Sequence, residues 1–177
     1  MDPAKVKELK KYLAPGPGWL IIGTFLLVIS ALTLPGMGFP ALIYLVFGAV
    51  LLWIGISSTN DVKKLLKSFE EKGELGRVLS DFESAQSYIK GKLRVGSYYL
   101  FGKKKGQVVR FEDIRQIWQT VHKRNGIESH RTLQYIDRQG KTQTLCDLQS
   151  REKSNDELIQ IMTLIKLHNP GVHLGYK

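Results

Sequence analysis

The pattern of hydrophobic and polar residues divides the chain into two unequal parts. From Tyr12 to Asn60, 49 consecutive residues include no Asp, Glu, Lys, Arg or His. A helix needs about 20 apolar residues to cross the roughly 30 Å hydrocarbon core of a bilayer, so this run is long enough for two crossings. Pro35-Gly36-Met37-Gly38 interrupts the run near its middle. The pattern therefore predicts a membrane hairpin of two helices, at about residues 19–34 and 39–57.

The first 18 residues form a separate predicted segment. Val6, Leu9 and Leu13 fall on one face of a helix over residues 2–13, which indicates an amphipathic interfacial helix. Prolines and glycines at residues 15–18 then break the chain before the first span. A cleaved signal peptide over residues 1–34 is the competing interpretation, because a basic start before an apolar stretch is its pattern. The break and the second span that follows at once argue against it.

Small residues recur at a spacing of seven along both predicted spans. They are Gly23 and Ser30, Thr24 and Ala31, and then Ala41, Gly48 and Gly55. Small side chains on one stripe allow two membrane helices to approach closely. The stripe packs either the hairpin against itself or one chain against another, and we expect the former because the partner helix is covalently attached.

Beyond residue 57 the periodicity predicts an α+β domain. Helices at 61–72 and 74–85 belong to a helical connector over residues 58–87. From Tyr88 the period becomes two, with turns at 102–106, 112–113, 125–126 and 138–141, and a last amphipathic helix follows at 157–168. Residues 88–177 are thus predicted to form an antiparallel sheet or barrel closed by a C-terminal helix.

Two stretches of this domain resemble bacterial pleckstrin-homology-like (PH-like) domains. Gln107-Val108-Val109-Arg110-Phe111-Glu112-Asp113-Ile114, followed by a strand with Trp118, is similar to the strand, acidic turn and strand of that family. Residues 133–141, Leu-Gln-Tyr-Ile-Asp-Arg-Gln-Gly-Lys, look like the family's next hairpin. The resemblance covers about residues 88–168. It implies a PH-like fold displayed by a small membrane protein with two spans.

Charge predicts the orientation of the hairpin. Lysines at 5, 7, 10 and 11 precede the first span, lysines at 63, 64 and 67 follow the second, and the turn between the spans carries no charge. Because positive residues stay on the cytoplasmic side, both termini are predicted to be cytoplasmic in a multi-pass cell-membrane protein. Of the net charge of +10, +2 falls in residues 1–60 and +8 in residues 61–177. A basic domain tethered to a bilayer meets anionic lipid first, so no nucleic-acid partner is expected.

The sequence contains no pattern of a catalytic, cofactor or metal site. His122, His130, His168 and His173 lack metal-ligand spacing, and the single cysteine, Cys146, fits a core position in a strand. Phosphate-loop, dinucleotide and nucleophile-elbow motifs do not occur. Glu112 and Asp113 fit a turn better than paired acid–base work. We therefore expect no enzyme activity, no cofactor and no metal.

Basic residues are the one remaining constellation with a functional mechanism. The candidates for lipid-surface contact are Lys90, Lys92 and Arg94 on a predicted strand and Lys103, Lys104 and Lys105 in the next turn. Attraction to anionic headgroups contributes about 1 kcal/mol per basic residue near the surface. The alternative is that these charges only keep the sheet soluble. The sequence favours a noncatalytic interaction or scaffold module with a protein partner, and the second interpretation is an anionic-lipid sensor that uses this strand and turn.

Overall fold

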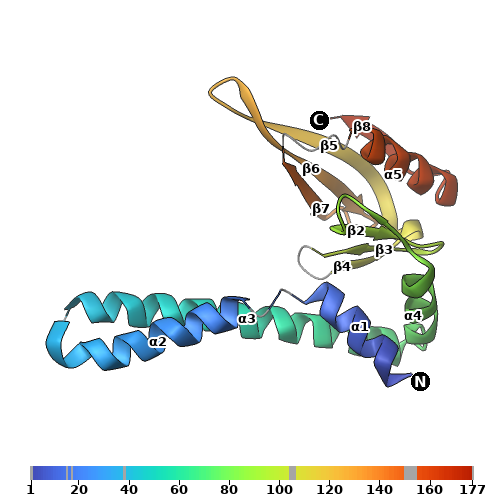
Figure 1. Ribbon diagram of the computed structural model, residues 1–177. Helices are drawn as coiled ribbons and strands as arrows, with labels where there is room; N and C mark the ends of the chain where they lie inside the picture. The colour runs from blue at the N-terminus through green and yellow to red at the C-terminus, as the bar shows by residue number, and fades with distance from the viewer. Residues whose placement is uncertain are drawn as a thin grey trace.

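The chain forms a long helical arm joined at one end to an α+β domain (Figure 1). The computed structural model describes residues 2–14, 16, 18–37, 39–103, 107–149 and 155–176. Its helices are α1 (Pro3–Leu13), α2 (Gly18–Met37), α3 (Phe39–Glu71), α4 (Leu75–Ser84) and α5 (Asn155–His168). The strands are β1 (Gln86–Tyr88), β2 (Leu93–Val95), β3 (Tyr99–Gly102), β4 (Gln107–Arg110), β5 (Ile114–Arg124), β6 (Ile127–Asp137), β7 (Thr142–Gln149) and β8 (His173–Tyr176). A 3₁₀ turn, η2 (Phe111–Asp113), connects β4 to β5.

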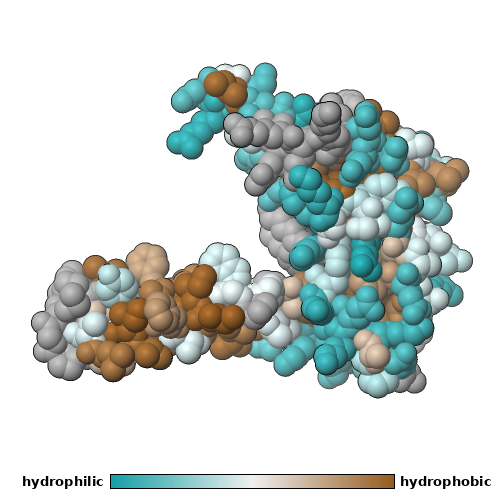
Figure 2. All heavy atoms as spheres, in the orientation of Figure 1, coloured by the Kyte–Doolittle hydropathy of each residue, from teal (hydrophilic) through white to brown (hydrophobic). Residues whose placement is uncertain are grey.

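Helices α2 and α3 pack antiparallel along the arm, and their outward side chains are apolar (Figure 2). Phe25, Leu32, Phe47 and Trp53 are all more than half exposed. A soluble surface rarely carries an apolar patch of this extent. Helix α3 is long and apolar enough to cross a membrane, and a second candidate arises if α1 and α2, which meet at a bend of 67°, are counted as one span.

The small-residue stripe lies between the two helices of the arm. A Cβ atom built on Gly48 would lie 3.0 Å from the Gly23 carbonyl oxygen. The buried Ser30 hydroxyl donates to the Ala41 carbonyl oxygen at 2.7 Å. Gly55 is in similar contact with Leu20. Thr24 and Ala31 are exposed and lie outside the contact, so only part of the predicted stripe packs the hairpin.

The helix predicted at 61–72 is not separate from the second span. Helix α3 continues without a break from Phe39 to Glu71, so residues 58–60, between the two predicted helices, lie inside it. At about 1.5 Å per residue its 33 residues extend about 50 Å, more than the thickness of a hydrocarbon core. The predicted end at Gly73 is confirmed, since this glycine has φ +69° after the last turn.

The apolar face of α1 is used within the protein. The amphipathic helix itself is confirmed, with Asp2 as its N-cap. Leu9 and Leu13 are completely buried, in one cluster with side chains of α3, α4 and β3. The expectation that this face would rest on a bilayer surface is therefore wrong, because α3 and α4 cover it.

The strands form two four-stranded sheets rather than a closed barrel over the described residues. One sheet has the order β1-β2-β3-β4 and is antiparallel throughout. The other has the order β7-β6-β5-β8, in which β8 pairs parallel with β5. Strand β8 was not predicted, and it departs from the purely antiparallel expectation. The main core lies between the sheets and α5, with Leu100, Ile117, Leu145 and Ile161 among its members.

Strand β3 separates two cores. Leu100 packs into the main core between the sheets. Its neighbours Tyr99 and Phe101 point to the other face and pack with α1, α3 and α4 in a second core. All four residues of β3 are buried, so this strand joins the helical arm to the α+β domain.

A carboxylate completes this junction. Asp81 of α4 is 5% exposed and accepts hydrogen bonds from the backbone N–H groups of Ser97, Tyr98 and Tyr99 at 2.7, 3.1 and 2.8 Å. A Cβ atom on Gly96 would lie 2.2 Å from a carboxylate oxygen of Asp81, so only glycine fits there. The β2–β3 turn is thereby fixed to α4.

Replacing Gly48 with leucine should loosen the arm. The new side chain must displace the Gly23 backbone or Leu27, and overpacking of this kind costs about 1–3 kcal/mol. Thermal unfolding in detergent should therefore occur at lower temperature for Gly48→Leu than for the control Ala49→Leu, whose site on the same helix is exposed. Equal melting temperatures for the two variants would show that this contact does not hold the hairpin together.

Asp81→Asn should destabilise the junction. An amide nitrogen cannot accept a hydrogen bond, so at least one of the three backbone N–H groups loses its partner, at a cost of about 1–3 kcal/mol. Near-UV circular dichroism during unfolding measures the effect, because Tyr99 and Phe101 report on the second core. The control Asp61→Asn, on the exposed face of α3, should leave the transition in place. If both variants unfold like the wild type, Asp81 does not anchor the turn.

Candidate functional site

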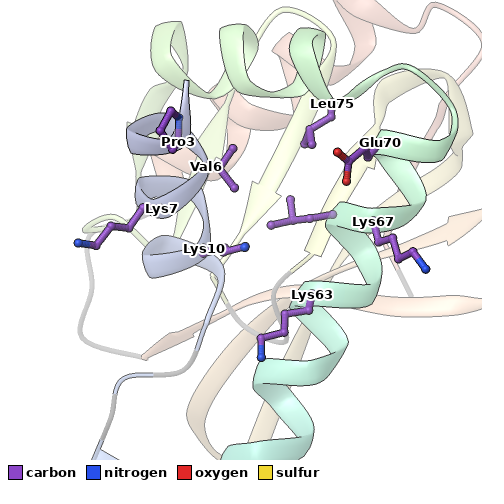
Figure 3. A pocket seen from close by; sticks show the side chains of 9 residues that line it. Pro3, Val6, Lys7, Lys10, Lys63, Lys67, Glu70 and Leu75 are labelled. Atoms are coloured by element: carbon purple, nitrogen blue, oxygen red, sulfur yellow. The ribbon is translucent and has the colours of Figure 1, made fainter. Parts of the chain in front are cut away.

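A cleft of about 630 Å³ lies between α1 and α3 (Figure 3). It opens where the arm meets the domain. Its floor is apolar, made by Val6, Leu66 and Leu75. Leu66 and Leu75 are buried in the second core, so the floor is part of the packed junction rather than a loose surface.

Four lysines and one glutamate line the cleft. Lys7 and Lys10 come from α1, and Lys63 and Lys67 come from α3. In Figure 3, Lys10 and Lys63 extend from the two facing helices toward the gap, whereas Lys7 and Lys67 lie at its outer sides. Lys67 is 3.7 Å from Glu71, one turn along α3. With Glu70 as the acidic lining residue, the five charged side chains of the lining sum to +3.

The cleft lies just beyond the apolar run. Lys63 is three residues after Asn60, the last residue of the uncharged run, which is about 4.5 Å along the helix. The polar headgroup layer begins at the edge of the hydrocarbon core and is about 5–8 Å deep. A bilayer that surrounds the arm would thus place its phosphates beside Lys63 and Lys10. The arrangement can bind an anionic headgroup while its apolar floor contacts the adjoining carbon chain.

Contacts between α1 and the domain hold one wall of the cleft in place. The Tyr12 hydroxyl donates to the Phe101 carbonyl oxygen at 3.1 Å, and burial raises the pKa of this hydroxyl. Lys5 and Glu83 are 2.7 Å apart, and the hydrogen bond from Lys5 to this carboxylate raises the pKa of the ammonium group. The Lys5–Glu83 pair is exposed and adds little stability. The buried face of α1 therefore fixes the position of Lys7 and Lys10 relative to α3.

In the structure, the predicted basic strand that carries Lys90, Lys92 and Arg94 is not formed over its whole length. Residues 89–91 form a turn with φ of +53°, +52° and +78°, and β2 begins only at Leu93. Lys90 therefore lies in a turn rather than on a strand beside Arg94. Lys92 donates to the Asp147 carbonyl oxygen at 3.1 Å. The predicted shared face of three cations over residues 90–94 is wrong because the chain reverses there.

Arg94 makes aromatic contacts in the junction. Its guanidinium carbon lies 4.5 Å from the Phe82 ring centre and 5.1 Å from that of Tyr12. Cation–π contacts of this kind contribute about 0.5–2 kcal/mol. Arg94 thus links β2 to α1 and α4. Lys103 directly follows β3, and its backbone N–H donates to the Lys92 carbonyl oxygen at 2.9 Å. Lys104 and Lys105 lie outside the described residues.

The remaining candidate residues do not converge on one site. His122 and His130 stack on each other with ring centres 4.2 Å apart, and His168 stacks on Phe111. Cys146 is buried in the main core. Glu112 lines a second hollow of only about 100 Å³ that also includes Arg77 and Arg110. Within the described part of the chain, no three His, Cys, Asp or Glu side chains are grouped to hold a metal ion.

Sequence reasoning used the lysines of the cleft only to orient the hairpin. A signal for the cleft is nevertheless present, because Val6, Leu9 and Leu13 on one helix and Val62, Leu66 and Phe69 on another form apolar faces flanked by lysine. Two such faces on the same side of a membrane can pack on each other.

Comparison of the chain with protein-family models, with curated proteins and with solved structures found no match.

Proposed function

We propose that this chain is an integral membrane protein of two spans that presents a noncatalytic interaction module at the cytoplasmic face of the cell membrane. The observation that carries the proposal is the shared strand β3, which is buried on one face by the α+β core and on the other by α1, α3 and α4. A domain on a flexible linker needs no such junction. A scaffold gains from it, because the junction fixes the height and angle of the domain above the bilayer.

The order of strands supports the proposed PH-like character of this module. A four-stranded antiparallel meander, β1 to β4, is followed by the meander β5 to β7 and then by α5. The proposed protein partner would add a strand to an open sheet edge, where main-chain groups are available. Strand β5 offers no free edge from Gln116 to Gln119, because β8 pairs with it there. The edge strands among the described ones are β1, β4, β7 and β8.

A second function, anionic-lipid sensing, is favoured by the cleft between α1 and α3. In this proposal the residues that contact lipid are Lys7, Lys10, Lys63 and Lys67 of the cleft, and not those of the basic strand predicted from the sequence. The expected ligand is the phosphate-bearing headgroup of an anionic phospholipid. Recognition would combine charge–charge attraction to Lys10 and Lys63 with contact between the glycerol or acyl region and the apolar floor.

Cysteine labelling on intact cells tests the membrane topology. A cysteine at Met37, between the spans, should react with an impermeant thiol reagent from outside, whereas one at Gln139, exposed on the domain, should react only after permeabilisation. Both belong in a Cys146→Ala background, because Cys146 is a free cysteine and the introduced residue must be the single thiol that the reagent can label. Labelling of Gln139→Cys but not Met37→Cys on intact cells would reverse the orientation.

Removing two lysines should abolish stabilisation by anionic lipid. In neutral detergent, added phosphatidylglycerol should raise the melting temperature of the wild type, because a ligand that binds the folded state stabilises it. Phosphatidylcholine and inorganic phosphate are the comparison ligands, and a rise with phosphate alone would indicate a simple anion site. The variant Lys10→Gln/Lys63→Gln should lose the rise.

Two further variants control for net charge. Lys72→Gln/Lys141→Gln removes the same charge from exposed positions outside the cleft. Lys103→Gln/Lys104→Gln removes it from the turn that the sequence proposed. Both should keep the lipid response. A response lost equally in all three variants would mean that general charge, and not the cleft, attracts the lipid.

A further inference from the structure

Strands β5 and β6 extend beyond the rest of their sheet as a two-stranded ribbon. Their pairing continues to Arg124 and Ile127 at the turn, whereas β7 pairs with β6 only as far as His130 and β8 pairs with β5 only as far as Gln119. Residues 121–129 therefore project without a neighbouring strand on either side in the described structure. The His122–His130 ring stack lies at the base of this projection.

The end of the ribbon combines apolar and basic side chains. Ile127 is 74% exposed and Val121 is 42% exposed, although both belong to β-strands. Lys123 and Arg124 beside them are exposed. Arg131 is paired with Glu128, whose pKa is lowered by the hydrogen bond from this guanidinium. Lys123 faces Glu128 across the strand pair, so the three cations Lys123, Arg124 and Arg131 with the one carboxylate of Glu128 give the tip a net charge of +2. An exposed isoleucine flanked by cations suits an anionic membrane interface.

The ribbon leaves the domain on the same side as the arm and diverges from it (Figure 1). In Figure 1 the β5–β6 ribbon leaves the domain toward the same side as α2 and the apolar part of α3. Figure 2 shows hydrophobic atoms among hydrophilic ones at the outer end of this projection. A bilayer crossed by the arm would therefore lie on the side toward which the tip points. Because the second core fixes the domain on α3, the direction of the ribbon is a property of the fold.

We infer that the tip of the β5–β6 ribbon is a second membrane contact. Ile127 enters the interfacial layer, and Lys123 and Arg124 pair with the phosphates of anionic lipids around it. This inference rests on the proposed insertion of the arm and adds a separate point of attachment. With the arm at one end and the tip at the other, the domain lies against the membrane, which leaves the α5 side of the structure facing the cytoplasm.

A fluorescent label on the full-length chain in lipid nanodiscs tests the contact. The environment-sensitive dye NBD is attached to Ile127→Cys in the Cys146→Ala background, with nanodiscs that contain phosphatidylglycerol and a lipid-borne quencher. The expected result is blue-shifted emission that the quencher reduces. The matched control is Gln139→Cys, in the exposed turn at the opposite end of β6, which should show neither change.

A third label separates this inference from the proposed insertion. Phe47→Cys lies on the apolar outer face of α3 and must be quenched if the arm is in the bilayer. Quenching at residue 47 without quenching at residue 127 would overturn the ribbon contact alone. No quenching at either position would overturn the insertion as well. A blue shift at residue 127 that lipid quenchers leave unchanged would assign the tip to a protein contact instead, and would also overturn the inference.

The proposed pairing of Lys123 and Arg124 with lipid phosphates is tested in the same assay. Quenching at residue 127 should be several-fold weaker in nanodiscs of phosphatidylcholine alone, because Lys123 and Arg124 then lose their anionic partners. The variant Lys123→Gln/Arg124→Gln should give the weaker value in both lipids, whereas Lys72→Gln/Lys141→Gln should not. Equal quenching in all of these samples would overturn the pairing with anionic phosphates.

Discussion

The two-sided burial of β3 is the constraint on which the rest of the structure depends. Tyr99 and Phe101 on one face close the core formed by α1, α3 and α4, while Leu100 on the other face closes the core between the sheets. Asp81 accepts three backbone hydrogen bonds from the turn that leads into this strand. Neither core is complete without the strand, so the arm and the domain form one body. This connection gives the cleft lysines and the β5–β6 ribbon fixed directions relative to the arm.

Helix α3 extends this constraint into the arm, because it runs without a break from the apolar arm into the second core. Its N-terminal half leaves Phe47 and Trp53 exposed, as lipid-facing residues are, while its C-terminal half buries Val62, Leu66 and Phe69 in the second core. The change occurs near Asn60, where the lysines begin. A break at this point would have separated the domain from the arm. Continuity instead fixes the basic cleft directly beyond the apolar run, which is the level of the lipid phosphates if the arm is inserted as proposed.

The sequence predicted most elements but few of the contacts between them. Local signals were sufficient for the two apolar helices, for α4, for the hairpin turn at Asn125-Gly126 and for α5, since each depends on periodicity or turn chemistry. The packing of α1 on α3 was missed because an amphipathic face fits a bilayer and a helix equally well. The contacts of Arg94 and Asp81 were also missed. The aromatic rings that contact Arg94 and the backbone N–H groups that donate to Asp81 are distant from them in the sequence. An aspartate three residues after Val78, on the same helix face, was nevertheless a signal that a buried carboxylate needs donors.

The central claim, that arm and domain form one body, is tested most directly by a distance between them. Spin labels at Lys64→Cys on α3 and Gln160→Cys on α5, both exposed, would be measured by pulsed electron paramagnetic resonance on the full chain in nanodiscs, in the Cys146→Ala background. The junction predicts a single narrow distance distribution that broadens when Asp81→Asn is added. A broad distribution without that substitution would contradict the account, because the domain would then move freely on the arm.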